Sequence, residues 1–145
     1  MPSITLNFPA SAVAALATFF LSYLWYTPLF GRAWAREMSF KVDREPTGGE
    51  LSRGLGLTLL GCFFMVLVLA HNIAVWAPQT WGRAALWTPW QETLNASFFT
   101  WLGFFVPVNL ARVAWEKASW RLFAINAGYH FTSLLVAAGI LSYWK

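Results

Sequence analysis

Asn126 and His130 are the residues whose types and spacing best suggest chemistry in this chain, and both lie in the apolar segment 125–130. Four positions apart on a helix, they share one face and can contact each other or a common partner. An imidazole inside an apolar helix can be an axial ligand to a tetrapyrrole or metal, or a polar contact for a quinone-like headgroup. A neutral histidine that donates to a carbonyl or to Asn126 is the structural alternative. Both interpretations stay open from the sequence.

The composition indicates that this pair is surrounded by lipid. The chain has 145 residues, of which 58% are hydrophobic and 11% charged, whereas soluble domains carry about 25% charged residues. A hydrocarbon core about 30 Å thick is crossed by about 20 apolar residues in a helix. Four segments are long enough, which predicts an all-α bundle of four transmembrane helices in a single domain spanning 1–145: about 9–30, 53–76, 92–112 and 120–144. The N-terminus lacks a basic region before its first apolar run, so we expect that helix to be retained.

The basic residues between these segments predict an orientation, because Lys and Arg in short loops are retained on the cytoplasmic side. They cluster in the first and third loops: Arg32, Arg36, Lys41, Arg44 and Arg53, then Arg112, Lys117 and Arg121. We therefore expect a cytoplasmic loop at 31–52, an interfacial outer segment at 77–91, and both termini on the outer side of the cell (inner) membrane. This asymmetry and attraction to anionic lipids explain the net charge of +4 without nucleic acid as a partner.

Nine of the ten tryptophans lie near the predicted helix ends, where indole rings anchor helices at the lipid headgroups. Trp101 differs, because it lies roughly 15 Å deep by helical rise. It either faces lipid or lines a pocket. His130 lies roughly 14 Å from the inner boundary by the same rise. We therefore predict a ligand site formed by a small set of residues: Trp101, Asn126, Tyr129 and His130.

A second polar group is predicted at the outer boundary, where His71 and Asn72 are expected to meet Glu92. These residues predict a small polar site or, more simply, an interfacial ion pair. His71 lies roughly 27 Å from the inner boundary by helical rise, far from the level of His130, which disfavours a bis-histidine haem. The single cysteine, Cys62, excludes an intramolecular disulfide and a thiol metal site. No metal site is predicted.

Two further patterns concern helix packing. Residues 17–20 precede Pro28, and the similar residues 96–99 precede Pro107 at the same distance, which suggests a duplicated helical hairpin. Small and polar residues also recur at helical spacing, and helices in lipid use such residues for close approach. One stripe on each helix is expected to face inward: Ser11, Ala15, Thr18 and Ser22; Gly54, Thr58, Gly61, Met65, Val68 and Asn72; Ala96, Thr100, Gly103 and Pro107; Asn126, His130, Ser133 and Ala137.

Three motifs carry a resemblance to a known family. They are residues 25–34 (WYTPLFGRAW), residues 115–117 (WEK) and residues 125–129 (INAGY). With these motifs in this order, the chain resembles the family of domain of unknown function 1761. The likeness covers nearly the whole length of the chain. The resemblance implies a small four-helix membrane protein and no particular reaction. In that family the position matching His130 is often another aromatic residue, so the resemblance implies no role for this histidine.

These observations predict a non-enzymatic integral membrane protein that either self-assembles into a homo-oligomer or serves as an accessory subunit of a larger membrane complex. Membrane lipids are its expected partners, and a lipid, a quinone or a tetrapyrrole pigment is the expected kind of ligand between its helices. The alternative is a small-solute transporter or channel, with a polar path through Thr18, Ser22, Asn126 and His130. An enzyme would need an acid within reach of His130, and no such pair is evident in the sequence.

Overall fold

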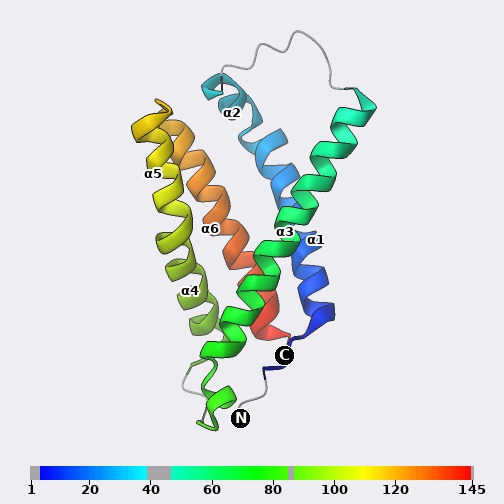
Figure 1. Ribbon diagram of the computed structural model, residues 1–145, viewed down its shortest axis with the longest axis vertical. Coiled ribbons are helices and arrows are strands. Elements are labelled where there is room, and N and C mark those ends of the chain that lie inside the picture. The colour runs from blue at the N-terminus through cyan, green and yellow to red at the C-terminus, as the bar shows by residue number, and fades with distance from the viewer. Residues whose placement is uncertain (1–3, 39–46, 85–86, 145) are drawn as a thin grey trace.

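The computed structural model describes residues 4–38, 47–84 and 87–144, and this part of the chain is mostly helical, with short connecting segments (Figure 1). The elements follow in this order: α1 (Phe8–Leu24), the π-helical turn η1 (Trp25–Leu29), α2 (Gly31–Glu37), α3 (Gly48–Trp76), the 3-10 turn η2 (Pro78–Trp81), α4 (Pro89–Thr100), the π-helical turn η3 (Trp101–Phe105), α5 (Val106–Trp115) and α6 (Trp120–Tyr143). Four continuous spans are long and apolar enough to cross a membrane: Phe8–Leu29, Gly48–Trp76, Pro89–Trp115 and Trp120–Tyr143. The predicted all-α class is confirmed, and so is the presence of four helices long and apolar enough to span a membrane.

Side-chain caps determine where the helices begin. Thr47 and Glu50 form a capping box at the start of α3, and Thr88 and Gln91 form another at the start of α4. The helices therefore start at Gly48 and Pro89, earlier than the predicted 53 and 92. The predicted loop 31–52 is wrong from Gly48 onward, where the chain is already helical, and residues 39–46 lie outside the described residues.

The predicted interfacial segment 77–91 is partly ordered by contacts with the end of α3. Within it, the Thr80 hydroxyl donates to the carbonyl of Ala74 at 2.6 Å, and the Trp81 indole donates to the carbonyl of Val75 at 2.7 Å. The η2 turn is thereby held against α3, while Pro89 and the residues after it already belong to α4. Residues 85–86 lie outside the described part. Placement of this segment at the outer membrane surface stays a prediction.

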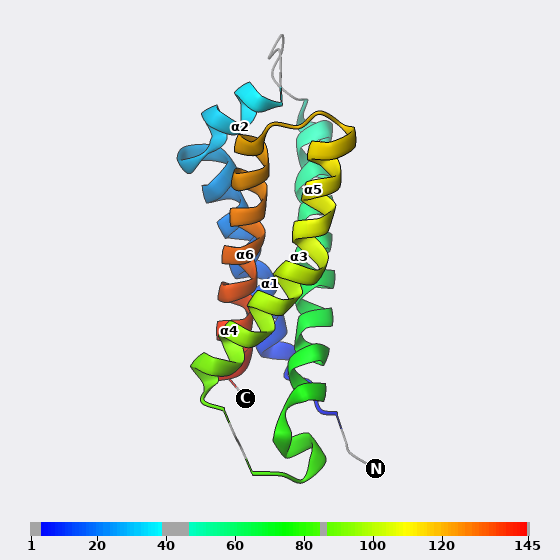
Figure 2. The same ribbon diagram turned by 90° about the vertical axis from the view of Figure 1, so that its left-hand side faces the viewer.

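α6 is the central helix, since it contacts α1, α2, α3, α4 and α5 (Figures 1 and 2). The core is built around its small residues, with Ala137, Ala138 and the fully buried Leu134 packed against Ala14 of α1 and Val66 of α3. Small side chains allow the helix axes to come close in lipid. Both chain ends lie at the same end of the bundle, where Asn7 Nδ2 donates to the carbonyl of Trp144 at 3.1 Å (Figure 1).

The bundle opens toward its other end, because α3 crosses the remaining helices obliquely and diverges from α5 and α6 (Figure 1). Residues 48–61 of α3 are exposed at every position. The predicted inward stripe of α3 is therefore wrong at Gly54, Gly61 and Val68, which are exposed. Thr58 is also exposed, but it faces the space between α3 and the other helices, as predicted. The buried side of this helix carries Cys62, Val66, Leu69, Ala70 and Ile73 instead.

The other stripes had mixed outcomes. All four predicted residues of α1 are buried, and on α6 Asn126, Ser133 and Ala137 are buried whereas His130 is half-buried. The third stripe is wrong, because Gly103 and Pro107 are exposed. Its helix instead buries Glu92, Thr93, Ser97 and Asn109. Spacing alone does not distinguish a small residue that permits close packing from one that faces lipid.

Two π-helical turns interrupt the first and third spans, and each begins with a tryptophan. The amide of Phe30 donates to the carbonyl of Trp25, and that of Val106 donates to the carbonyl of Trp101, so both bonds join residues five apart. The extra residue in such a turn rotates the helix after it. Pro28 lies inside its turn and Pro107 follows the other. The prolines therefore hold different places relative to the turns, and hairpin duplication stays a prediction.

Both of these tryptophans attach their helices to α6. Trp25 Nε1 donates to the carbonyl of Ile125 at 3.1 Å, and Trp101 Nε1 donates to the carbonyl of Ala127 at 2.8 Å. Gly128 makes room for the first ring, because a Cβ at this position would lie 3.3 Å from Trp25 Cζ2. The two π turns thus direct two indole N–H groups to carbonyls two residues apart on one helix.

We expect Gly128→Leu to displace the Trp25 ring and to lower the free energy of unfolding by about 1–3 kcal/mol, the usual cost of overpacking. Unfolding in mixed micelles, followed by circular dichroism, measures this change. The matched control is Gly61→Leu, because a Cβ at Gly61 has no atom within 4 Å. Equal stability of the two variants would contradict the packing described here.

Candidate functional site

A large cleft lies at the open end of the bundle, between α1, α2, α3, α5 and α6. It has a volume of about 1020 Å³, which lies at the upper limit of ligand pockets in proteins. Helices in lipid present such a space to acyl chains as well as to smaller molecules. We refer to this space as the central cleft, and it is lined by Phe19, Phe20, Ser22, Tyr23, Tyr26, Thr27, Trp34, Met38, Leu51, Leu55, Thr58, Val108, Asn109, Arg112, Asn126, Tyr129 and His130.

Three of the four predicted ligand-site residues line the central cleft. Asn126 is 7% exposed, and its Oδ1 accepts a hydrogen bond of 3.0 Å from the Tyr26 hydroxyl. The sequence left open whether this amide contacts His130 or a partner common to both, and the observed partner, Tyr26, comes from η1. Tyr129 is buried between these groups, with its ring centre 5.0 Å from that of Tyr26. Asn126, Tyr26 and Tyr129 together form one polar and aromatic wall.

His130 lies at the side of the cleft nearest η3. Its imidazole stacks on Phe105 with ring centres 4.4 Å apart and an interplanar angle of 27°, and it also contacts the Tyr129 ring at 5.1 Å. This stacked, half-buried position orients the imidazole by ring contacts. The described residues contain no group of three or more His, Cys, Asp and Glu side chains that could hold a metal ion.

Trp101 lies outside the central cleft. Its indole nitrogen donates to the carbonyl of Ala127, and its ring packs on Phe131 with centres 5.2 Å apart. These contacts join η3 to α6, so Trp101 neither lines the cleft nor depends on lipid for its partner. The prediction that grouped it with Asn126, Tyr129 and His130 is not met by the geometry.

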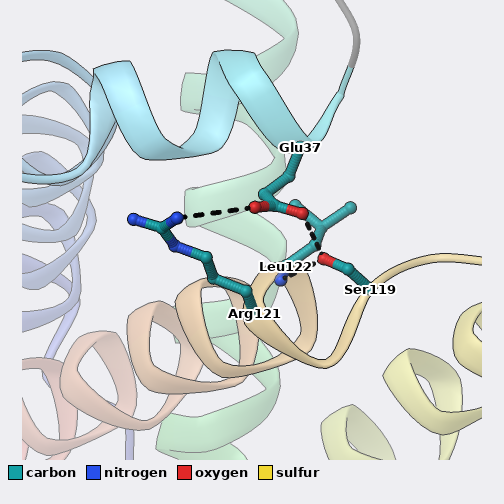
Figure 3. Close-up of polar contacts among 4 residues, drawn as sticks. All are labelled: Glu37, Ser119, Arg121 and Leu122. Carbon is teal, nitrogen blue, oxygen red and sulfur yellow. Dashed lines mark hydrogen bonds and ion pairs between the residues drawn. The ribbon is translucent and has the colours of Figure 1, made fainter.

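α2, which lies at one end of the cleft, is positioned by an ion pair and a hydrogen bond to the start of α6 (Figure 3). The Glu37 carboxylate accepts from the Ser119 hydroxyl and lies 3.8 Å from Arg121 Nη1. Ser119 in turn caps α6 by accepting from the amide of Leu122 at 3.1 Å. α2 is therefore held over the start of α6, which places Trp34 beside Tyr26, with ring centres 5.5 Å apart.

Gly31 makes this arrangement of α2 sterically feasible. A Cβ at Gly31 would lie 2.7 Å from the carbonyl oxygen of Tyr26, closer than atoms can approach without a shift. Only glycine therefore fits where the chain leaves η1 and enters α2. The turn places α2 so that it closes one end of the cleft.

The cleft is amphipathic along its length. Asn109 and Arg112 contribute polar groups from α5, and Phe20, Leu55 and Val108 contribute apolar surface from three helices. Arg112 Nε also donates to Glu116 at 3.0 Å on the exposed side. Sequence reasoning did not include Tyr26, Trp34, Asn109 or Arg112 in the site. Tyr26 and Trp34 belong to the motif at 25–34, which was the one signal that could have indicated them.

The predicted outer polar site is divided by the structure. Asn72 and Glu92 line a common pocket of about 340 Å³ between α3 and α4. His71 is exposed, and its Nδ1 lies 2.8 Å from the carbonyl oxygen of Leu67 on its own helix. The imidazole is thus turned away from the pocket that its neighbour Asn72 lines.

Comparison with known proteins identifies the family. Residues 9–142 match the family described as protein of unknown function (DUF1761), and because this is nearly the whole chain, the chain belongs to that family. The resemblance inferred from the three motifs is therefore confirmed. No curated protein and no solved structure matches the chain.

We expect Tyr26→Phe to lower the free energy of unfolding by about 0.5–1.5 kcal/mol, because it leaves the buried Asn126 amide without its hydroxyl donor. Tyr143→Phe is the matched control, since Tyr143 is exposed and lies outside the cleft. Denaturant unfolding in mixed micelles compares the two variants. A Tyr26→Phe protein as stable as the control would show that the hydrogen bond contributes nothing measurable.

Proposed function

We propose that this member of the DUF1761 family is a non-enzymatic membrane protein that binds an amphipathic molecule in its central cleft. A lipid, a quinone or a tetrapyrrole pigment fits this description. The supporting observation is the cleft of about 1020 Å³, open at the side where α3 diverges. A ligand with a polar headgroup and an apolar body would find both kinds of surface there.

The polar groups of the cleft support recognition of a headgroup. Arg112 offers charge-assisted donors to an anionic or carbonyl oxygen, and the Tyr26–Asn126 pair lies deeper, beside Tyr129. The Phe20, Leu55 and Val108 side chains would contact the apolar body. No acid–base pair suited to proton transfer accompanies His130, whose described ring contacts are aromatic, so we favour binding over catalysis.

We further propose that the protein either self-assembles or serves as an accessory subunit in a larger membrane complex. The first half of α3 supports this proposal, because residues 48–61 are exposed on every side and include Gly54, Gly56 and Gly61. Helices in membranes commonly associate through such small residues. A second copy or a partner subunit could pack there beside the mouth of the cleft.

Transport of a small solute is the alternative, and one observation weighs against it. The hydroxyls of Thr18 and Ser22 donate to carbonyls of their own helix. Because these hydroxyls are already bonded within α1, they are poorly suited to line a water path. Beyond Thr18 lies the apolar core around Ala14, Val66 and Leu134, all 0% exposed. A solute would need this packing to separate.

The basic residues support an orientation in which the open end of the bundle faces the cytoplasm and both termini face outward, in the cell (inner) membrane. Arg32, Arg36 and Arg121 are at the open end, whereas Arg83 follows η2 at the other. A duplicated hairpin would suit this arrangement, because its two copies would cross the membrane in the same direction.

Cysteine labelling of intact cells tests the orientation. In a Cys62→Ala background, we expect a membrane-impermeant maleimide to label Gln79→Cys and to leave Gly48→Cys unlabelled until the cells are opened. Both positions are exposed and lie at opposite ends of the bundle. The reverse pattern would contradict the proposed orientation, and labelling of both or neither in intact cells would contradict a single defined topology.

Obstruction of the cleft tests the proposed function. Thr58 lines the cleft and the neighbouring Leu57 does not, so Thr58→Trp fills the space while Leu57→Trp adds the same ring to the outer side of α3. We expect Thr58→Trp to weaken ligand retention about tenfold, as a clash of about 1.4 kcal/mol would do. Native mass spectrometry and absorption spectra of gently extracted protein measure the retained species.

Two results of that experiment would overturn the proposal. One is wild-type protein that retains no lipid, quinone or pigment after gentle extraction. The other is equal retention by the Thr58→Trp and Leu57→Trp variants, which would locate the bound molecule outside the cleft. Circular dichroism of both variants verifies that each remains helical.

A further inference from the structure

A second pocket, separate from the central cleft, lies between α3 and α4 at the end of the bundle that carries the chain termini. Its volume is about 340 Å³, which suits one small group rather than a whole amphiphile. We refer to it as the Glu92 pocket. Its lining comes from α3, the segment before α4, α4 itself and η3: Asn72, Ile73, Trp76, Trp87, Glu92, Asn95, Ala96, Phe99, Thr100 and Phe104.

The one ionisable residue in this lining is Glu92, which is only 8% exposed. It lies in the first turn of α4, where the helix dipole favours a negative charge, and the Thr88–Gln91 capping box fixes the backbone of that turn. A carboxylate removed from water requires compensation from donors or cations. The amides of Asn72 and Asn95 supply further polar groups at the same pocket.

The remaining walls are largely aromatic. Trp76, Trp87, Phe99 and Phe104 surround the space next to the carboxylate, and each of these side chains is exposed enough to accept a contact. The face of an aromatic ring attracts cations, and rings that share a pocket with a carboxylate suit a quaternary ammonium ion, whose methyl groups are weakly hydrated.

From this combination we propose that the Glu92 pocket binds an organic ammonium group. The ring faces would contact the substituents on nitrogen, and the Glu92 carboxylate would neutralise the charge. A bare divalent cation is disfavoured, because it requires several oxygen ligands and most of this lining is apolar. An anion would be repelled by the carboxylate. Arg83 belongs to an adjoining hollow with Trp81 and is not part of the lining.

The ammonium group could come from a lipid headgroup or from a free organic cation. The pocket lies between two spanning helices near their ends, so a phosphatidylcholine headgroup could enter from the bilayer. A soluble cation such as choline could enter from water. Both sources present the same chemistry to the rings and the carboxylate, and they are distinguished by competition.

Calorimetric titration of the whole protein in maltoside micelles, which contain no ammonium, tests the proposal. The probe is choline, and its neutral isostere is 3,3-dimethylbutanol. We expect choline to bind at least about tenfold more tightly than the isostere, as an added desolvated cation–π contact would give. Glu92→Gln should abolish this preference, whereas Glu116→Gln, an exposed carboxylate at the opposite end, should retain it.

A second variant distinguishes a direct loss of binding from a loss caused by misfolding. Trp87→Leu keeps the carboxylate and changes a half-exposed ring, and we expect it to weaken choline binding while circular dichroism stays unchanged. Displacement of choline by phosphatidylcholine, but not by phosphatidylglycerol, would identify a lipid headgroup, and binding without displacement would identify a free cation. Equal binding of choline and its isostere, or full binding by Glu92→Gln, would overturn the proposal.

Discussion

Hydrocarbon cannot hydrogen-bond, and this constraint governs the placement of most polar groups in the bundle. A donor N–H at membrane depth has no solvent to bond to, so its partner has to come from the protein. The indoles of Trp25 and Trp101 find theirs in the carbonyls of Ile125 and Ala127. Through these bonds two spans are attached to α6 at almost the same level. α6 thus becomes the helix against which the others are positioned.

The π turns allow two spans to be attached to α6 while the central cleft stays open. A regular helix carrying Trp25 would continue in one direction, but the wider turn and Pro28 redirect the chain so that α2 lies over the start of α6. The same turn presents Tyr26 to Asn126. One irregularity therefore serves both packing and the cleft, and a change at Gly31 or Gly128 would affect both.

Sequence reasoning predicted the fold class because apolar length is a direct consequence of membrane thickness. It also identified Asn126, Tyr129 and His130, since their helical spacing places them on one side of α6. Tyr26, Asn109 and Arg112 were not predicted in the site, because they reach it from other helices and only the π turns bring them there. The partner of Trp101 was missed for the same reason. An indole at mid-depth indicates burial or lipid contact, whereas its actual partner is a backbone carbonyl that no pattern reveals.

The α3 stripe failed for a related reason. Gly54 and Gly61 have the spacing of a packing face, yet α3 diverges in this half and its buried residues begin at Cys62. Divergence is set by the crossing of whole helices, which depends on the core around Val66 and Leu134 and not on local sequence. The same divergence opens the central cleft, so the residues that would have closed the bundle are the ones left available to a ligand or to another subunit.

The central cleft and the Glu92 pocket differ in charge in a way that follows from their positions. The central cleft contains Arg112 and opens at the end where the basic residues gather, while the Glu92 pocket contains a carboxylate at the end where they are few. Each combines one charged side chain with aromatic rings, which supply contact area without hydrogen-bonding demands. Opposite charges at opposite ends mean that the two sites select different headgroups. A single zwitterionic or neutral molecule would therefore not bind both sites in the same way, and occupancy of one can be examined independently of the other.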